Sequence, residues 1–451
     1  MAKSHTIFSC QQCGSTYKNW TGRCTHCGAW SSLIQQFDDT SRDEKSAVGR
    51  GQTSGKTLNF VSIKDLEVSD DNQRLSTGFR DLDIVLGGGI LPGAVALLAG
   101  QPGIGKSTLL MQICAEIAKT KTVLYVSGEE SAGQVKLRAI RLGAESDNLK
   151  FASSTSANDI AKTIESGDFD LIIVDSIQTL TLAEISSAPG GISQVTNCGN
   201  LIIRAAKLSN TAVIIVGHVT KEGTLAGPKV LEHLVDIVLN FEGDRYGGFK
   251  IIRAIKNRFG STSEAAIFEM NQSGLAEVEN PSAALLAERQ NTDGSIILAT
   301  LEGTRPILVE IQALATPTNF GYPKRTASGF DLNRLNLLIA VIERRTKLRL
   351  NDKDIFINVV GGLRIQDSAA DLAVCLAIAS AIAGRKLAED FVVFGEVGLG
   401  GEIRSAFRPD QRIAEAKKLG FAHAIAPVTV KDKFVIPVRD LRHTLIDYVN
   451  E

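Results

Sequence analysis

The segment GQPGIGKS, residues 100–107, constrains the fold of this 451-residue chain more than any other feature. It matches the phosphate-loop pattern GxxxxGK[ST], it follows the apolar run AVALLA, and it precedes the helical pattern TLLMQICAEIAK. That context matters because a phosphate loop turns backbone N–H groups toward phosphates at the start of a helix. Lys106 is predicted to reach the β and γ phosphates of a nucleotide, and Ser107 to bind Mg²⁺. The predicted nucleotide-binding residues are Gly100, Gln101, Pro102, Gly103, Ile104, Gly105, Lys106 and Ser107.

Strand and helix patterns alternate around this loop, from about residue 58 to 275. Short β-branched runs such as VLYVSG, LIIVDS and AVIIVGH are separated by helical stretches. Such alternation predicts a mostly parallel sheet covered by helices. The run LIIVDS ends in Asp175, which is placed to hold Mg²⁺ together with Ser107. This half of the chain is therefore predicted to be an α/β nucleotide-binding domain.

Two acidic residues, Glu129 and Glu130, follow the predicted strand VLYVS. Hydrolysis needs a carboxylate near the γ-phosphate to orient or deprotonate water, and either residue could supply it. The alternative is an exposed helix N-terminus, where negative charge is favourable. Position in the sequence does not choose between the two carboxylates.

Four of the seven cysteines form two CxxC pairs separated by ten residues, CQQCGSTYKNWTGRCTHCG. Each pair can present two thiolates from one tight turn, and two such turns complete a tetrahedral zinc site. A site closed by four sulfur atoms has no open position for substrate, so the zinc is predicted to be structural. The predicted zinc ligands are Cys10, Cys13, Cys24 and Cys27.

The zinc module, predicted to span residues 1–30, carries no acidic residue, since Asp38 is the first in the chain. Basic and aromatic residues surround its cysteines, a mixture that suits either a nucleic acid or a protein partner: Lys3, Tyr17, Lys18, Trp20 and Arg23. Residues 31–57 are polar and poor in large apolar side chains, which predicts a flexible linker.

Composition narrows the class of protein. A net charge of −1 with 22% charged residues argues against a polycation that coats nucleic acid, so any such contact must come from local patches. The start MAKSHTIFSC lacks a signal-peptide pattern, and the weakly polar run 84–100 is interrupted by glycines and Pro92. We expect a cytoplasmic protein with no membrane segment.

Residues 285–451 show a different pattern. Two paired strand patterns, an amphipathic helix, a further strand and the buried helical pattern AADLAVCLAIASAIAG follow one another. This order predicts a separate α+β domain.

The segment LSTGFRDLDIVLGGGILPGAVALLAGQPGIGKSTLL (75–110), with YVSGEES and LIIVDS, resembles the RecA-type ATPase core of recombinases, DnaB-type helicases and KaiC-like proteins. The resemblance implies that Glu129 activates water, with Glu130 as its neighbour, and that ATP sits between subunits of a ring or filament. It also implies that loops 181–200 and 220–236 touch DNA. His218, at the end of AVIIVGH, would be a sensor of the γ-phosphate.

The motif KNRFG, residues 256–260, follows the last strands of this core. Alone it would be a cationic turn at a strand end. After a RecA-type core, Lys256 and Arg258 are predicted to reach the phosphates of an adjacent subunit or the DNA, with Phe259 and Gly260 fixing the turn. An arginine there could stabilise phosphoryl transfer.

The C-terminal part is similar to the proteolytic domain of Lon, which needs a serine nucleophile and a lysine base. In the best register Ala369 takes the nucleophile position, with Ser368 one residue away, and Asp410 takes the position of the base. A gapped alignment would place Lys417 or Lys418 there instead. The domain is therefore predicted to be proteolytically inactive. It carries a basic cluster that either binds phosphates or is a solvated helix end, formed by Lys324, Arg325, Arg344, Arg345, Lys347 and Arg349.

In this order, a four-cysteine zinc module, a RecA-type core, KNRFG and a Lon-like domain resemble the RadA (Sms) family of bacterial DNA-repair proteins. The resemblance implies a DNA-dependent, helicase-like ATPase that uses ATP, Mg²⁺ and zinc and processes recombination intermediates. It further implies a hexameric ring on single-stranded and branched DNA, association with the nucleoid, and the RecA recombinase as a partner. Two alternatives are an ATP-dependent Lon-like protease and a KaiC-like regulator of a protein partner.

Overall fold

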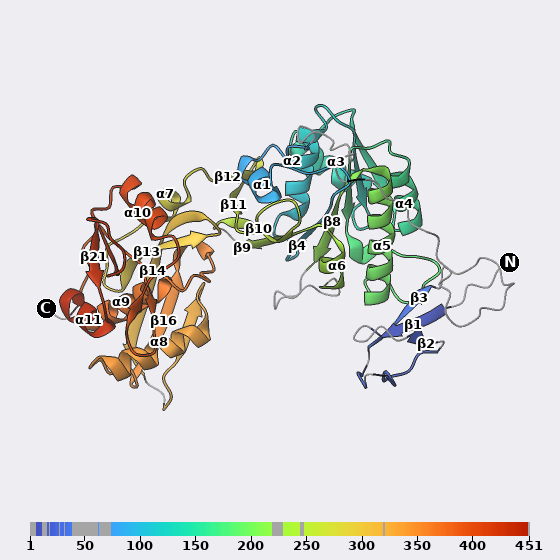
Figure 1. Ribbon diagram of the computed structural model, residues 1–451. Helices are drawn as coiled ribbons and strands as arrows, with labels where there is room; N and C mark the ends of the chain where they lie inside the picture. Colours follow the sequence, from blue (N-terminus) through green and yellow to red (C-terminus); the bar gives the residue numbers. More distant parts are fainter. Residues whose placement is uncertain are drawn as a thin grey trace, which may run out of the picture.

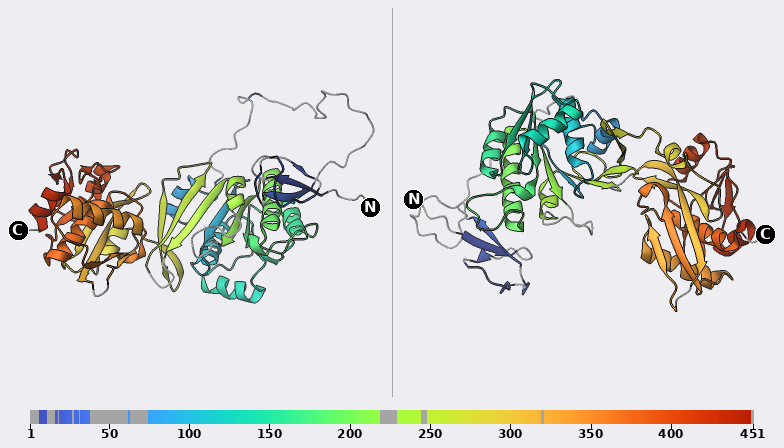
Figure 2. Two further views of the ribbon diagram at one scale, coloured as in Figure 1. Left: turned by 90° about the horizontal axis from the view of Figure 1, so that it is seen from below. Right: turned by 180° about the vertical axis from the view of Figure 1, so that it is seen from behind.

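The computed structural model describes residues 6–10, 16–17, 19–26, 28–30, 32–37, 62, 74–218, 229–243, 248–318 and 321–449. In the described residues, three larger sheets follow one another along the chain, a small N-terminal sheet, a nine-stranded sheet and a seven-stranded sheet, and a two-stranded sheet accompanies the last. The nine-stranded and seven-stranded sheets lie side by side, with the C-terminal sheet coloured from yellow through orange to red (Figure 1 and Figure 2). Within the described ranges, no helix is long and apolar enough to cross a membrane.

The N-terminal sheet has the strand order β2-β1-β3 and is antiparallel; its strands are β1 Thr6–Cys10, β2 Thr16–Tyr17 and β3 Leu33–Phe37. Strand β3 corrects our prediction that a linker begins at residue 31. Its polar sequence LIQQF hid a strand that pairs with β1 along its whole length. Leu33 also packs against the buried residues Cys10 and Cys24, so the strand belongs to the core of the N-terminal module. The rest of the predicted linker, residues 38–57, lies outside the described residues.

The nine-stranded sheet has the order β12-β11-β10-β9-β4-β8-β7-β5-β6. Strands from β9 to β6 are parallel, and β9 to β12 pair antiparallel. The predicted apolar runs form fully buried central strands, as expected where helices cover both faces of a parallel sheet. The strands are β4 Val95–Gly100, β5 Val123–Ser127, β6 Leu149–Ser153, β7 Leu171–Asp175, β8 Ala212–His218, β9 Ile237–Gly243, β10 Lys250–Asn257, β11 Ala265–Asn271 and β12 Gly274–Glu277.

Helices pack on both faces of this sheet and form two separate cores. One face carries α1 Arg80–Leu86, α2 Lys106–Ile117 and α3 Ala132–Arg141; the other carries α4 Ala157–Glu165, α5 Ile192–Ser209 and α6 Lys229–Leu234. Helix α5 includes residues 192–200 of the first predicted DNA loop (Figure 1). In the second predicted loop, residues 229–234 form α6, while 220–228 lie outside the described residues.

The C-terminal domain has a seven-stranded sheet with the order β15-β16-β14-β13-β17-β20-β21, and its core includes helix α9, which is buried over residues 370–380. Its strands are β13 Ser295–Glu302, β14 Arg305–Pro317, β15 Arg325–Ser328, β16 Lys353–Val359, β17 Phe391–Val393, β20 His423–Pro427 and β21 Val435–Val438, with β18 Glu396–Val397 and β19 Ile403–Arg404 as a separate pair. Its helices are α7 Pro281–Leu286, α8 Leu332–Arg345, α9 Ala370–Ala383, α10 Pro409–Lys418 and α11 Leu441–Val449.

Polar contacts join the nine-stranded sheet to the C-terminal domain. The Arg253 guanidinium on β10 bonds to the buried Glu302 carboxylate at the end of β13. The turn after Glu302 continues this joint, since Thr304 Oγ1 donates to Glu264 Oε2 at 2.6 Å. Gly303 has a φ of +65°, and a Cβ there would lie 2.0 Å from the Ser263 carbonyl oxygen, so the close approach requires glycine.

Candidate active site

The phosphate loop joins the C-terminal end of β4 to the first turn of α2. Gly103 and Gly105 have φ angles of +79° and +119°, which side chains other than glycine rarely adopt. Gly100 is required for a different reason, because a Cβ there would lie 2.8 Å from the Phe241 carbonyl oxygen. The backbone of the predicted phosphate loop therefore requires glycine at these three positions.

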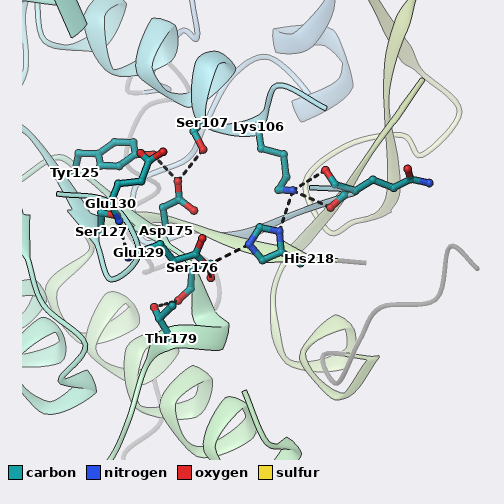
Figure 3. Close-up of polar contacts among 12 residues, drawn as sticks. Lys106, Ser107, Tyr125, Ser127, Glu129, Glu130, Asp175, Ser176, Thr179 and His218 are labelled. Carbon is teal, nitrogen blue, oxygen red and sulfur yellow. Dashed lines mark hydrogen bonds and ion pairs between the residues drawn. The ribbon is translucent and has the colours of Figure 1, made fainter. Parts of the chain in front are cut away.

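Lys106 is buried at the start of α2 (Figure 3). Its Nζ donates to the carbonyl oxygens of Gly100 at 2.8 Å and Gln101 at 3.0 Å, and lies 3.2 Å from His218 Nδ1. Burial lowers the pKa of Lys106 to about 8, although Asp175 and Glu129 attract the proton. A desolvated cation held by weak carbonyl partners is well placed to bind phosphate oxygens instead.

Asp175 ends β7 and faces Ser107 across the loop. Its Oδ2 accepts hydrogen bonds from Ser107 Oγ at 3.0 Å and from the buried Tyr125 hydroxyl at 2.6 Å. A hydroxyl and a carboxylate at this separation are oxygen ligands that suit Mg²⁺, so the residues present fit that ion. Tyr125, on β5, fixes the carboxylate orientation. Sequence analysis missed this role because a tyrosine inside an apolar strand looks like an ordinary core residue.

Glu129 points into the same site from the end of β5. Its Oε1 accepts a 2.5 Å hydrogen bond from Ser176 Oγ and lies 3.3 Å from His218 Nε2 (Figure 3). These contacts lower the pKa of Glu129 to about 2, with the hydrogen bond from His218 as the main cause and burial opposing it. His218 therefore bridges Lys106 and Glu129, one through each ring nitrogen.

Glu130 has a different partner. Both of its carboxylate oxygens accept from the Arg138 guanidinium of α3, at 2.5 and 2.6 Å. Such a bidentate pair fixes both side chains and occupies the oxygens that would otherwise act on water. The two neighbouring glutamates thus differ in their partners: Glu129 contacts Ser176 and His218 in the site, whereas Glu130 is paired with Arg138.

These side chains surround one open cavity of about 450 Å³. It is lined by Pro102, Gly103, Gly105, Lys106, Ser107, Thr108, Glu129, Glu130, Arg138, Arg141, Asp175, His218 and Met270. Segments far apart in the sequence meet here because the carboxyl ends of parallel strands β4, β5, β7 and β8 lie at one edge of the sheet.

Comparisons with known proteins agree with this arrangement. A family described as an AAA domain matches residues 62–224, a rubredoxin metal binding domain matches 8–35, and the subunit ChlI of Mg-chelatase matches 335–430. Proteins named DNA repair protein RadA are 46% identical in Halalkalibacterium halodurans, 44% in Pseudomonas aeruginosa and 45% in Bacillus subtilis. These alignments cover 95%, 95% and 97% of this chain and 93%, 94% and 95% of the relatives.

The chain belongs to the RadA family of DNA repair proteins. The predicted fold class is confirmed, with an N-terminal zinc ribbon, a RecA-like α/β core and a ChlI/Lon-like C-terminal domain. A crystal structure of the RadB recombinase covers 46% of the chain and 100% of its own length, at 22% identity and a TM-score of 0.35, a likeness too weak to carry an argument.

The KNRFG motif of this RadA-family chain makes contacts within its own subunit. Lys256 Nζ donates to the carbonyl oxygens of Glu232, His233 and Val235, at 2.8, 3.1 and 2.7 Å, where α6 ends. Arg258 is 55% exposed and lies 3.3 Å from the buried Asp236 carboxylate. Neither side chain is among the described residues that line the phosphate-loop cavity, so their predicted action on a neighbouring subunit remains a prediction.

The zinc ribbon brings together one cysteine from each CxxC pair. Cys10 and Cys24 are both buried, and the Tyr17 hydroxyl lies 3.1 Å from Cys24 Sγ. Cys13 and Cys27 lie outside the described residues. Gly28, directly after the second pair, has a φ of +77°, which is typical of the tight turn that follows paired zinc ligands. Cys10 and Cys24, buried in one cluster, fit two ligands of a structural zinc ion, and the match to a rubredoxin metal binding domain covers the same residues.

The Lon-like domain lacks a serine and lysine pair in the predicted register. Ala369 is fully buried at the start of α9, and Ser368 Oγ donates to Glu396 Oε2 at 3.1 Å. In the described C-terminal domain, Lys417 is paired with Asp432 at 3.0 Å rather than with Ser368. Asp410 lies in the first turn of α10. In the described C-terminal domain, Ser368 thus has Glu396 rather than a lysine as its hydrogen-bond partner, and the absence of protease activity stays a prediction.

Proposed function

We propose that this chain is a DNA-stimulated ATPase that drives branch migration and extends strand exchange during homologous recombination and repair. The observation that carries the proposal is the meeting of Lys106, Ser107, Glu129, Asp175 and His218 around one cavity at the phosphate loop. Membership of a family of DNA repair proteins supplies the cellular setting. The proposed cofactors are ATP with Mg²⁺, and zinc for the N-terminal ribbon.

Each side chain has a proposed task in hydrolysis. Lys106 binds the β and γ phosphates, while Ser107 and Asp175 hold Mg²⁺, which neutralises phosphate charge when bound. Glu129 accepts the proton of the attacking water, as its ionised carboxylate allows. His218 contacts both Lys106 and Glu129, and it ends β8 directly before residues 219–228. A change at the γ-phosphate would therefore reach the second predicted DNA loop through His218.

The proposed substrates are single-stranded and branched DNA, held at the centre of a hexameric ring in the cytoplasm, on the nucleoid. Loops 181–200 and 220–236 would contact the strand. Arg258, which is exposed, would complete the site of the neighbouring subunit, and Lys256 would act there or on the DNA. The RecA recombinase is the proposed protein partner, and the basic cluster of the C-terminal domain a proposed second DNA surface.

The decisive test is ATP hydrolysis with and without forked DNA, together with branch migration of a four-way junction. We expect DNA to stimulate the wild type and Lys106→Ala to lose hydrolysis by a factor of about a hundred or more. Lys121→Ala is the matched control, because Lys121 is half-exposed on the same core. Hydrolysis that ignored DNA would instead favour an ATP-driven regulator of a protein partner.

A further inference from the structure

Both tryptophans of the chain, Trp20 and Trp30, lie in the zinc ribbon, and both are exposed. The exposed fraction is 59% for Trp20 and 74% for Trp30. Tryptophan usually buries most of its surface, so two exposed indole rings in one small module indicate a binding function.

Trp30 is held in a defined position by Arg23. The Arg23 guanidinium lies over the Trp30 ring, 5.6 Å from its centroid, and the two residues form an antiparallel bridge. Arg23 Nε also donates to the Gly28 carbonyl at 2.9 Å, while Cys24 N donates to Ala29 O at 2.8 Å. The turn that carries the second cysteine pair therefore fixes both the cation and the ring.

The charge of the ribbon points to an anionic partner. Residues 1–37 contain no aspartate or glutamate, but they contain Lys3, Lys18 and Arg23. An exposed ring with a guanidinium on one face leaves its other face for a flat π system, and the guanidinium can also contact a phosphate. Unpaired bases offer such faces, whereas the bases of a duplex are already stacked on one another.

We propose that Trp30 and Arg23 form a stacking platform on the zinc ribbon that binds unpaired bases of single-stranded DNA, with the exposed Trp20 of the same ribbon as a second ring for stacking. This inference rests on the proposed action on DNA and adds a contact site outside the ATPase core. Zinc contributes indirectly, by holding the turn that presents Arg23 and Trp30. The platform would grip a displaced single strand while the core acts on the branch point.

Intrinsic tryptophan fluorescence tests this proposal directly in the full-length protein, because both tryptophans lie in the zinc ribbon. The probe is an oligodeoxythymidylate, with a blunt duplex of equal phosphate content as comparison. We expect the oligodeoxythymidylate to quench the emission and to shield it from acrylamide, and the duplex to do neither. The single-tryptophan variants Trp20→Phe and Trp30→Phe keep an aromatic ring at each position and show which indole is quenched.

Substitution gives the second measurement. Trp30→Ala should weaken oligodeoxythymidylate binding about tenfold, since base stacking on one aromatic side chain is of that order. Trp30→Phe should retain most of the affinity, and Tyr322→Ala, which removes an exposed ring in the C-terminal domain, should retain all of it. The zinc content of each variant is measured, so that loss of the ribbon fold is separated from loss of the ring.

Three results would overturn the proposal. One is emission that oligodeoxythymidylate leaves unchanged at saturating concentration, and another is a zinc-loaded Trp30→Ala protein that binds it as the wild type does. The third is quenching that occurs only when the recombinase is added without DNA, which would assign the surface to a protein. DNA-stimulated hydrolysis by the same variants distinguishes failure of the platform from failure of the proposed function. If the variants bind oligodeoxythymidylate as the wild type does but DNA still stimulates their hydrolysis, only the platform is ruled out.

Discussion

Glu129 and Glu130 are neighbours in the sequence, but only one carboxylate is free of an arginine partner in the structure. Glu129 contacts Ser176 and His218 in the phosphate-loop cavity, whereas Glu130 is paired with Arg138. We expect Glu129→Gln to lower ATP hydrolysis by about a hundredfold or more, because a positioned general base contributes that much. Glu130→Gln should keep hydrolysis within about threefold and lose about 1 kcal/mol of unfolding free energy.

Steady-state hydrolysis and urea unfolding of the two variants measure these effects. The pair is a matched set, since each substitution removes one charge from adjacent residues at the end of the same strand. If Glu130→Gln lost hydrolysis while Glu129→Gln kept it, the assignment of the water-activating carboxylate would be reversed.

Lys106 gives the site a predicted dependence on pH. Its pKa is lowered to about 8 by burial, and only the protonated amine attracts phosphate. ATP binding should therefore be constant below about pH 8 and weaken as the pH rises above it, because the free enzyme loses the proton that the complex must regain. Lys106→Arg is the control, since a guanidinium remains charged. The affinity for a fluorescent ATP analogue from pH 7 to 9.5 measures this; a parallel decline in both proteins would contradict the role of Lys106.

At the scale of elements, strand β10 connects α6 to the rest of the core. Its Lys256 amine donates to three carbonyl groups at the C-terminal end of α6, where unpaired helix carbonyls favour a cation. We expect Lys256→Ala to raise amide hydrogen exchange in residues 229–236 and to reduce DNA stimulation, with basal hydrolysis retained. Hydrogen exchange followed by mass spectrometry, with Lys121→Ala as control, measures this. Lost hydrolysis with unchanged exchange would contradict this role in positioning α6 and would leave the proposed action of Lys256 at the neighbouring subunit's site.

Strands and their ends could be predicted from the sequence where a buried apolar run is followed directly by a polar residue of the site. LIIVD is apolar because both faces of β7 are covered, and the acidic residue marks its edge, so Asp175 could be placed beside Ser107 in advance. Contacts between distant segments could not be predicted this way. The hydrogen bonds from Lys256 to the carbonyl groups at the end of α6 could not be predicted, because every residue has a backbone carbonyl and its residue type does not indicate the contact. Strand β3 was missed because pairing with β1, rather than apolar composition, stabilises LIQQF.

At the scale of the whole molecule, Arg253 links the ATPase core to the C-terminal domain. It pairs with Glu242 on the neighbouring strand and with Glu302, which is only 4% exposed. Burial raises the pKa of Glu302, and the Arg253 guanidinium opposes that shift. The ionised carboxylate thus depends on Arg253 in a place where water cannot replace it.

We therefore expect Arg253→Met to lower the free energy of unfolding by about 3 kcal/mol at neutral pH, because one buried charge loses its partner. The double variant Arg253→Met with Glu302→Gln should recover most of that loss. The sign of the pH effect follows from the raised pKa: the cost is present while Glu302 is ionised, and it shrinks as the pH falls and the carboxylate takes a proton. Calorimetry and denaturant unfolding at pH 8 and pH 5 measure it. Equal stability of the single and double variants would show that the contact between the ATPase core and the C-terminal domain does not depend on this ion pair. The C-terminal domain would then be held to the core by its other contacts, such as the hydrogen bond from Thr304 to Glu264.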